Sequence, residues 1–354
     1  MIRILHSADF HLDTPFEGLP EEKAVIQRKA QRELLRRMAE LCRERNVRLV
    51  LLAGDLLDSG LAYFETWESL TSALEEMTVP VFIAPGNHDF CAPDSPYLRY
   101  AFPKNVHIFT SHKIDSVTLP DLNVRIWGAG FNQNRCPSLL QGFSAQNDGL
   151  INIMVIHGQL GGTDYNPITE AQIAASGLDY IALGHVHTYS GVRTAGKTAY
   201  AFSGCPMGRG FDETGKKGVV IADVGRGSTS AELVPLGGRE YKILQSGENE
   251  LDTAMADATE NDIIRLILTG KWIDQPDLRR IIDTYSGKCF HLTVVDRTSP
   301  ARDIWYGIED DSLRGLFLRR MRERLDDPAA DRDLVLTAVR YGLDAFDNRE
   351  VPTE

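Results

Sequence analysis

The sequence contains no apolar run that approaches the roughly 18 residues of a membrane-spanning helix. It also has no CxxC pair and an odd number of cysteines, namely Cys42, Cys91, Cys136, Cys205 and Cys289. Neither a disulfide framework nor a thiolate zinc site is therefore expected, and free thiols in a reducing cytoplasm are the simplest interpretation. A strand pattern begins at Ile2 and candidate functional residues follow at once, so we expect no signal peptide.

Basic residues are outnumbered by acidic ones, with 38 Lys and Arg against 50 Asp and Glu. The net charge of −12 argues against broad, nonspecific binding to polyanions, although local basic patches are compatible with it. The composition is otherwise that of an ordinary globular protein, with 43% hydrophobic and 25% charged residues. A chain of 354 residues accommodates one large domain and one smaller domain.

Short apolar runs alternate with helical patterns in the first part of the chain, which predicts an α/β fold with buried parallel strands. The run at residues 47–52 ends in Gly54-Asp55 and so carries a carboxylate to the carboxyl edge of the sheet. Taken alone, an Asp at this place is more often a helix N-cap. A helix of about 25 residues is expected from Glu21 to Arg45. Four later strand signals, at 191–193, 198–202, 218–224 and 232–236, suggest an antiparallel or mixed second sheet.

Gly237-Gly238 is the expected domain boundary. Beyond it the pattern changes to strands at 241–244, 263–268 and 290–295, with helices at 277–284, 312–325 and 331–345. We therefore predict a large domain at 1–238 and a compact α+β domain at 239–354.

Five of the strand-like runs end in polar residues that can bind metal. The segments are Asp9-x-His11, Gly54-Asp55-x-x-Asp58, Gly86-Asn87-His88-Asp89, His157-Gly158 and Gly184-His185-x-His187. Asp9 and His11 are two residues apart, so in an extended backbone their side chains point the same way. Carboxylate, imidazole and amide ligands without thiolate suit Mn, Fe or Zn. About seven ligands fit two ions that share one bridge, and two ions about 3.5–4 Å apart are suited to displacement at phosphorus.

These five segments resemble the signature blocks of the calcineurin-like metallophosphoesterase superfamily, and the resemblance extends to about residue 225. It implies a four-layer α/β/β/α sandwich with a smaller C-terminal α+β capping domain. It further implies two divalent ions, one held by Asp9, His11, Asp55 and His187, and the other by Asp55, Asn87, His157 and His185, with Asp55 as the bridge. A hydroxide shared by the ions would attack the phosphorus.

His88 follows a ligand without being one, and by the same resemblance it is the general acid that protonates the leaving oxygen. Asp58 is then expected to orient His88 and to fix its tautomer. No covalent nucleophile is required by this scheme.

Within the superfamily, the chain resembles the DNA-repair exonuclease branch, in particular the bacterial SbcD-type and YhaO-type nuclease subunits. The resemblance is carried by HSADFHLD at 6–13, by SGCPMGRGFDETGKKG at 203–218 and by the domain after Gly238. Ser59 and Asp89 depart from the pattern of phosphoprotein phosphatases. This branch implies a manganese-dependent exonuclease, able in some members to cut internally, that forms a homodimer and acts with a coiled-coil ATPase of the SbcC or YhaN type.

Candidate DNA contacts are Arg28 in a basic stripe on the first helix, Arg209 in the 203–218 segment, and Arg314 and Arg319 in the helix at 312–325. That last helix is expected to place Leu313, Leu316, Phe317, Met321 and Leu325 on one apolar face. A solvated basic face is the alternative interpretation of these arginines. Two further hypotheses are a phosphodiesterase for small or cyclic nucleotides and a non-catalytic scaffold. The domain after Gly238 argues against the first, and His88 with the full ligand set argues against the second.

Overall fold

The computed structural model describes residues 1–59, 62–273, 275–300 and 304–346. The chain divides into two compact units, Met1–Lys242 and Ile243–Glu354, which are described separately below. All five cysteines are free and buried, as the sequence predicts. Within the described residues, none of the helices combines the length and the apolar character needed to cross a membrane.

The first sheet of unit 1 has the strand order β14-β13-β1-β2-β3-β4. Its strands are β1 (Ile2–Ser7), β2 (Leu49–Leu52), β3 (Val81–Ile83), β4 (Val106–Ile108), β13 (Val219–Gly225) and β14 (Ser228–Val234). Strands β1 to β4 are parallel, whereas β13 is antiparallel to β1 and to β14. Every residue of β2 is buried, as expected of a strand covered on both faces.

The second sheet has the order β11-β12-β10-β7-β6-β5. It consists of β5 (Asp115–Leu119), β6 (Val124–Ala129), β7 (Ile151–His157), β10 (Tyr180–Gly184), β11 (Arg193–Ala195) and β12 (Thr198–Phe202). The prediction that the last four strand signals form this sheet is wrong for β13 and β14, which join the first sheet. They cover the edge of β1, and strand periodicity alone does not specify which edge a strand will pair with.

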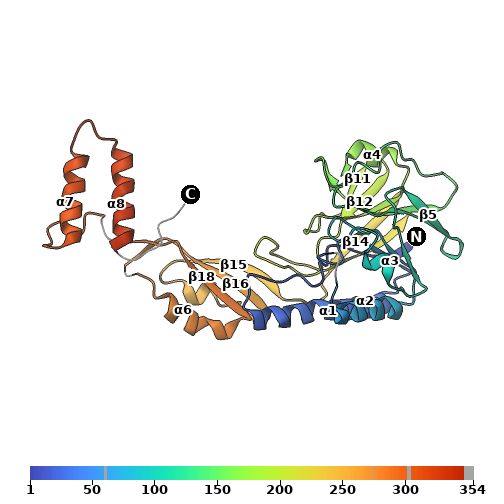
Figure 1. The fold of residues 1–354 in the computed structure, drawn as a ribbon, viewed down its shortest axis with the longest axis horizontal. Helices are drawn as coiled ribbons and strands as arrows, with labels where there is room; N and C mark the ends of the chain where they lie inside the picture. Colours follow the sequence, from blue (N-terminus) through green and yellow to red (C-terminus); the bar gives the residue numbers. More distant parts are fainter. Residues whose placement is uncertain (60–61, 274, 301–303, 347–354) are drawn as a thin grey trace. The chain divides into compact units, whose positions relative to one another are not determined.

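The two sheets of unit 1 pack face to face. The core between them combines Ile4 and Leu51 of the first sheet with Ile126, Val155 and Ala182 of the second. Helices α1 (Glu21–Glu44) and α2 (Phe64–Glu76) pack side by side and bury their apolar faces along the first sheet (Figure 1). The short helix α4 (Glu170–Ala175) helps to cover the outer face of the second sheet. Unit 1 is thus the predicted four-layer α/β/β/α sandwich.

Several short elements of unit 1 were not predicted. They are α3 (Pro96–Arg99), the 3-10 turn η1 (Pro120–Leu122), β8 (Gln159–Leu160) and β9 (Pro167–Ile168). Each is too short for periodicity to reveal it.

Unit 2 is an α+β module. Its elements are β15 (Glu240–Ser246, which begins in unit 1), α5 (Leu251–Ala254), β16 (Asp262–Leu268), β17 (Lys271–Trp272), α6 (Leu278–Tyr285), η2 (Ser286–Lys288), β18 (His291–Asp296), β19 (Ser299–Pro300), α7 (Leu313–Leu325) and α8 (Arg332–Phe346). Strands β15, β16 and β18 form a sheet whose core includes Ile264, Leu266 and Ile281.

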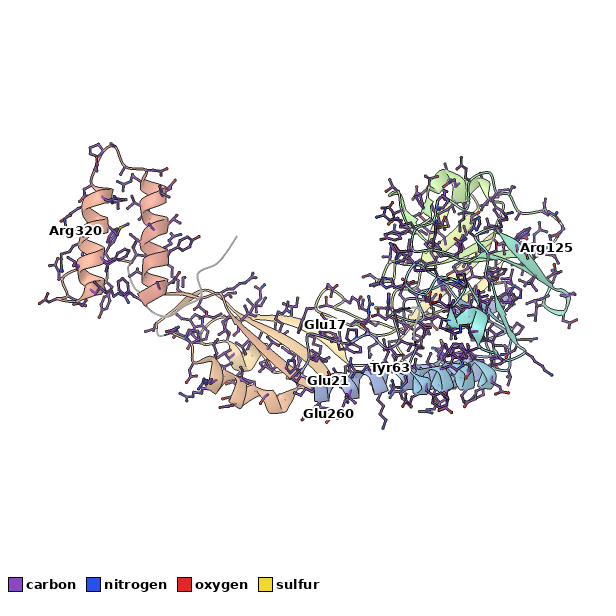
Figure 2. All side chains as sticks on the ribbon, in the orientation of Figure 1. Glu17, Glu21, Tyr63, Arg125, Glu260 and Arg320 are labelled. Carbon is purple, nitrogen blue, oxygen red and sulfur yellow. The ribbon has the colours of Figure 1, made fainter. Side chains whose placement is uncertain are left out.

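Helices α7 and α8 pack together around Leu318, Val339 and Leu343. The apolar face predicted for α7 is partly wrong, because Leu313 and Leu316 are 72% and 48% exposed. Phe317 and Met321 do pack against the hairpin core, Leu325 is buried, and Arg320 marks the solvent face of α7 (Figure 2). A two-helix hairpin buries only a narrow stripe of α7, which leaves the flanking leucines uncovered.

Candidate metal centre

The five predicted segments all follow strand ends at the same edge of unit 1. Three follow the adjacent parallel strands β1, β2 and β3, and two follow the adjacent parallel strands β7 and β10. Gly184 lets the two groups meet, because a Cβ at this position would overlap the main-chain oxygen of Ala53 at the end of β2. A close approach of backbones that only glycine permits therefore joins the two halves of the site.

The backbone of these loops is left-handed at four non-glycine residues. The φ angles are +55° at Asp9, +46° at His11, +52° at Asp55 and +105° at His185. Our prediction that Asp9 and His11 share an extended backbone is wrong. Backbone conformations of this kind cost free energy and concentrate at functional sites, where the surrounding structure holds them in place.

The turns nonetheless bring the predicted ligands together. Asp9, His11 and His187 each present a ligand atom within 4.8 Å of the others, as do Asp9, Asp55 and His157. One oxygen of Asp55, Oδ2, lies 3.7 Å from His11 Nε2 and 3.5 Å from His157 Nε2. Asp55 Oδ2 thus approaches one histidine from each of the two ligand sets implied by the resemblance, as expected of a shared ligand.

Hydrogen bonds define which ring nitrogens are available to bind a metal. His157 Nδ1 lies 2.9 Å from the main-chain oxygen of Ala53 and must donate to it, so Nε2 carries the lone pair. That Nε2 faces Asn87 Oδ1 at 3.0 Å, a spacing that suits two ligand atoms of one cation. His11 Nδ1 is bonded to Asp58, and its buried Nε2 has no hydrogen-bond partner within the described part of the chain.

The protonation states suit metal ligands. Burial lowers the pKa of His11, His157 and His185 to about 4, so these imidazoles are neutral at pH 7. Burial, and then the neighbouring Asp55 carboxylate, raises the pKa of Asp9 well above its usual value. Buried carboxylates that repel one another are stabilised by a divalent cation. The residues present therefore fit the pair of ions predicted from the sequence.

Asn87 and His185 complete the second set. The Oδ1 of Asn87 lies 3.2 Å from His185 Nδ1, and the His185 main-chain N–H donates to both oxygens of Asp9 at 3.0 Å. All seven predicted ligands thus lie in one contiguous cluster.

His88 lies beside this cluster and is exposed. Its main-chain N–H donates to Asp55 Oδ1 at 2.9 Å, and its ring is 4.7 Å from that of His11. The contact expected from Asp58 has a different form: His88 Nδ1 lies 3.3 Å from the main-chain oxygen of Asp58. The carboxylate of Asp58 instead lies 3.0 Å from His11 Nδ1 and 3.6 Å from Arg209 Nη1.

The predicted DNA contacts in unit 1 have partners inside the protein. Arg28 bonds to Glu21 Oε1 at 2.8 Å and to the main-chain oxygen of Pro15. Arg209 bonds to Glu213 and approaches Asp58, with its side chain only 18% exposed. Its predicted role as a DNA contact is therefore not supported by its position, because the guanidinium is directed at carboxylates of the site.

The predicted contacts in unit 2 lie on α7. Arg319 donates to the main-chain oxygens of Ile308 at 2.7 Å and Asp310 at 3.1 Å. Arg314 is half-buried at the start of the same helix. Arg319 is thus used in part to tie α7 to the preceding loop.

Two residues that sequence reasoning left out also shape the site. Asp89 is buried and accepts the main-chain N–H groups of Gly86 and Leu56, which fixes the loops that carry the ligands. Glu213 is buried and bonds to His187 Nδ1 at 2.6 Å. Asp89 belongs to a ligand motif and could have been found there, whereas Glu213 lies in the 203–218 segment and does not directly follow a strand end as the ligands do.

A two-sheet sandwich whose strand-end loops gather aspartate, histidine and asparagine side chains is the arrangement that the sequence predicted for a metal-dependent phosphoesterase. The family model described as calcineurin-like phosphoesterase matches residues 2–189, more than half of the chain. The chain belongs to the calcineurin-like phosphoesterase family.

Three relatives are similar over longer stretches. The chain is 30% identical over 246 residues to the uncharacterized metallophosphoesterase YhaO of Bacillus subtilis, with 66% of this chain and 60% of YhaO covered. It is 22% identical over 343 residues to the DNA double-strand break repair protein Mre11 of Methanopyrus kandleri, with 88% and 73% covered. It is 26% identical over 270 residues to SbcD, a component of the nuclease SbcCD of Bacillus subtilis, with 63% and 66% covered. The matches thus span less than two thirds of YhaO and of SbcD.

Proposed function

We propose that this phosphoesterase is a two-metal phosphodiesterase that acts on DNA, as an exonuclease with a capacity for internal cleavage, in DNA repair. The observation that carries the proposal is the convergence of the seven candidate ligands in one cluster that includes Asp55. The choice of DNA is supported by the similarity to a DNA-repair protein and to a component of a nuclease.

The ligand sets proposed from the sequence are compatible with the observed cluster. Asp9, His11, Asp55 and His187 would hold one ion, and Asp55, Asn87, His157 and His185 the other. Mixed nitrogen and oxygen ligands favour Mn²⁺ as the working ion, with Fe or Zn as substitutes. Two bound divalent ions lower the pKa of water toward neutrality and neutralise charge on the phosphate oxygens.

His88 is proposed as the general acid. It is exposed, so a substrate can reach its ring, while its main-chain N–H remains bonded to Asp55. The Asp58 main-chain oxygen, 3.3 Å from His88 Nδ1, would hold that proton on Nδ1 in the neutral ring. In the protonated ring, Nε2 then carries the proton given to the leaving oxygen. Asp58 thus positions His88 through its backbone and His11 through its carboxylate.

Residues 1–238 would form the nuclease domain, and residues 239–354 a cap that holds DNA or a coiled-coil ATPase of the SbcC or YhaN type. If arginines such as Arg314 contact phosphates, DNA cleavage should fall steeply with salt, since each neutralised phosphate releases counterions. A flat salt response would contradict a DNA-holding cap. We also propose a cytoplasmic location, which the free thiols favour.

A homodimer is proposed through the start of α2 and through α3. Tyr63, labelled in Figure 2, and Phe64 lie at the start of α2. They are 62% and 71% exposed, and Tyr100, just after α3, is 55% exposed. Trp67 of α2 joins these surfaces, with its ring 4.7 Å from that of Tyr100. Sedimentation should give a dimer that Phe64→Glu dissociates; a monomeric wild-type protein would contradict this.

Substrate class is tested with the purified chain and Mn²⁺. End-labelled duplex DNA, a cyclic dinucleotide and an aryl phosphodiester are assayed in parallel, with the Asp55→Ala variant as control. We expect nucleotides to be released from DNA, faster than the dinucleotide is cleaved. Cleavage of the dinucleotide alone would replace DNA by a small-molecule substrate, and equal rates for wild type and variant would contradict a metal-dependent activity.

A further inference from the structure

The loop between β12 and β13 contributes a buried carboxylate to the site. Glu213 is 5% exposed, and its Oε1 lies 2.6 Å from His187 Nδ1 and 2.6 Å from Arg209 Nη2. Its Oε2 accepts the main-chain N–H of Arg209 at 2.8 Å. The buried carboxylate thus accepts hydrogen bonds from two side chains and one main-chain group.

Arg209 links this carboxylate to a second one. Its Nη1 lies 3.6 Å from Asp58 Oδ1, and the same oxygen of Asp58 is 3.0 Å from His11 Nδ1. Two histidines of the cluster, His11 and His187, are thus each held at Nδ1 by a carboxylate, and Arg209 lies between the two carboxylates. We name Glu213, Arg209 and Asp58 the carboxylate clamp.

The hydrogen bonds of the clamp determine the ring nitrogens that face the cluster. Arg209 Nη2 is also 2.9 Å from His187 Nδ1, but Glu213 Oε1 can accept from both groups at once. When Nδ1 of His187 donates to Glu213 Oε1, its nearer partner at 2.6 Å, Nε2 is left as the lone-pair nitrogen. His11 has the same arrangement, since Nδ1 faces Asp58 and Nε2 is buried without a partner in the described structure.

The other two histidines of the cluster are held differently. His157 donates Nδ1–H to the uncharged main-chain oxygen of Ala53 at 2.9 Å, and the ring of His185 faces Asn87, a proposed ligand of the same ion, rather than a carboxylate. A carboxylate partner makes an imidazole a stronger ligand than a neutral partner does. The clamp therefore distinguishes the two proposed metal sites.

We infer that Glu213 and Arg209 are positioning residues that orient His187 and His11 and strengthen one of the two metal sites, the one with Asp9, while leaving the other unaffected. This inference rests on the proposed two-metal function. It assigns a role to the 203–218 segment, whose Arg209 was predicted from the sequence to contact DNA.

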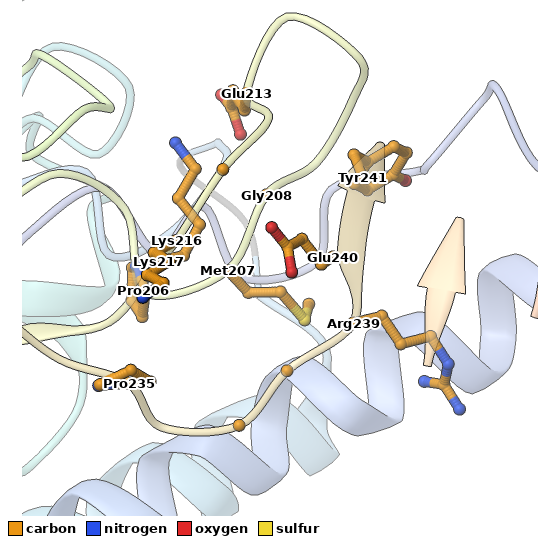
Figure 3. A pocket seen from close by; sticks show the side chains of 13 residues that line it. Pro206, Met207, Gly208, Glu213, Lys216, Lys217, Pro235, Arg239, Glu240 and Tyr241 are labelled. Carbon is orange, nitrogen blue, oxygen red and sulfur yellow. The ribbon is translucent and has the colours of Figure 1, made fainter. Parts of the chain in front are cut away.

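The loop that carries Glu213 is anchored independently of this carboxylate. Phe211 packs edge-on against Tyr241 with ring centroids 5.2 Å apart, and Lys217 Nζ donates to the main-chain oxygen of His187 at 2.8 Å. A cavity of about 210 Å³ lies beside the loop, lined by Met207, Tyr241 and side chains of both charges (Figure 3). Replacing Glu213 by the isosteric Gln should therefore leave the loop in place.

The test is Mn²⁺ binding to the full chain, measured by calorimetry and by electron paramagnetic resonance. In Glu213→Gln we expect one of the two affinities to fall about 10–100-fold, the usual effect of losing such a partner, and the other to stay within twofold. Glu213→Asp, which keeps the charge, should recover part of the loss. Asp223→Asn is the matched control, because Asp223 pairs with Arg3 at the surface. A double variant with Arg209→Gln should lose little more, since both residues act in one clamp.

A second readout follows the tautomer directly. ¹⁵N spectra of the metal-free protein should show the His187 proton on Nδ1 in the wild type and a shift toward Nε2 in Glu213→Gln. If the wild type binds two ions and Glu213→Gln binds both of them with wild-type affinity, the inference is overturned. An equal loss at both sites would also overturn it. A wild type that binds fewer than two ions would instead contradict the proposed function, whatever the variant does. Should Glu213→Gln not fold, Glu213→Asp decides by the same criteria.

Discussion

Replacing Asp89 with Asn should loosen the two loops that carry Asp55 and Asn87. The buried carboxylate of Asp89 accepts five hydrogen bonds, from the N–H groups of Asp55, Leu56, Leu57 and Gly86 and from the hydroxyl of Tyr97. Two of them reach Oδ1, from Gly86 at 2.8 Å and Asp55 at 3.2 Å, and the others reach Oδ2. An amide nitrogen at either position therefore faces at least two donors.

The cost can be worked out from these bonds. Each hydrogen bond to a charged group contributes about 1.5–3 kcal/mol, so losing two costs about 3–6 kcal/mol. Burial raises the pKa of Asp89, and Asp55 raises it further, so neutralising this residue recovers part of the cost. We therefore expect a loss near the lower limit, about 3 kcal/mol, which corresponds to a fall of about 6–12 °C in the melting temperature of a unit of this size.

The assay is thermal unfolding of the metal-free protein, with hydrogen exchange to locate the change. Peptides that contain Leu56 and Gly86 should exchange faster in Asp89→Asn, and those of unit 2 should not. Asp94→Asn is the control, since Asp94 is exposed nearby. A melting temperature within 2 °C of wild type, with unchanged exchange at Leu56, would refute the role assigned to Asp89.

Three further predictions concern the site and its surroundings. Gly86→Ala should weaken Mn²⁺ binding at least tenfold, because the new Cβ would overlap Asp55 Oδ1. Gly18→Ala is the control and should bind Mn²⁺ normally, since a Cβ there meets nothing. Equal Mn²⁺ binding by both variants would contradict this. His88→Ala should still bind both ions, as measured by elemental analysis, while its turnover rate falls about 10²–10⁴-fold. Loss of an ion in this variant would argue against a general acid. Burial lowers the pKa of His6 to about 3, so folding favours its neutral form, and stability is lost as pH falls from about 6.5 toward 3. Between pH 7 and 5, the free energy of unfolding of the metal-free protein should therefore fall by about 2 kcal/mol less in His6→Gln than in the wild type, as measured by urea unfolding. Parallel plots of this free energy against pH for the two proteins would contradict the role of His6.

Much of the fold could be predicted because the apolar runs are short and well separated. The run that became β2 is buried along its whole length, and the helix expected from Glu21 ends within one residue of its prediction, at Glu44. The sheet that receives β13 could not be predicted, because an apolar strand pattern is compatible with either free edge. The exposure of Leu313 could not be predicted either, because helical periodicity does not show how much of α7 its partner helix covers.

The ligand residues could be predicted because each lies within a short motif at a strand end. The contacts that hold these residues in place could not be predicted. The family resemblance implied that Asp58 orients His88, but the carboxylate of Asp58 faces His11, a choice that depends on loop conformation. Glu213 comes from a distant loop, and no local pattern predicts its bond to His187. Contacts that connect separate loops depend on the tertiary fold.

The most direct test of the two-metal centre is an anomalous difference map from crystals of the chain grown with Mn²⁺. The account predicts two peaks per chain with the Asp55 carboxylate between them, and none at this place in Asp55→Ala. A single peak, or an Asp55 side chain that contacts neither ion, would contradict it.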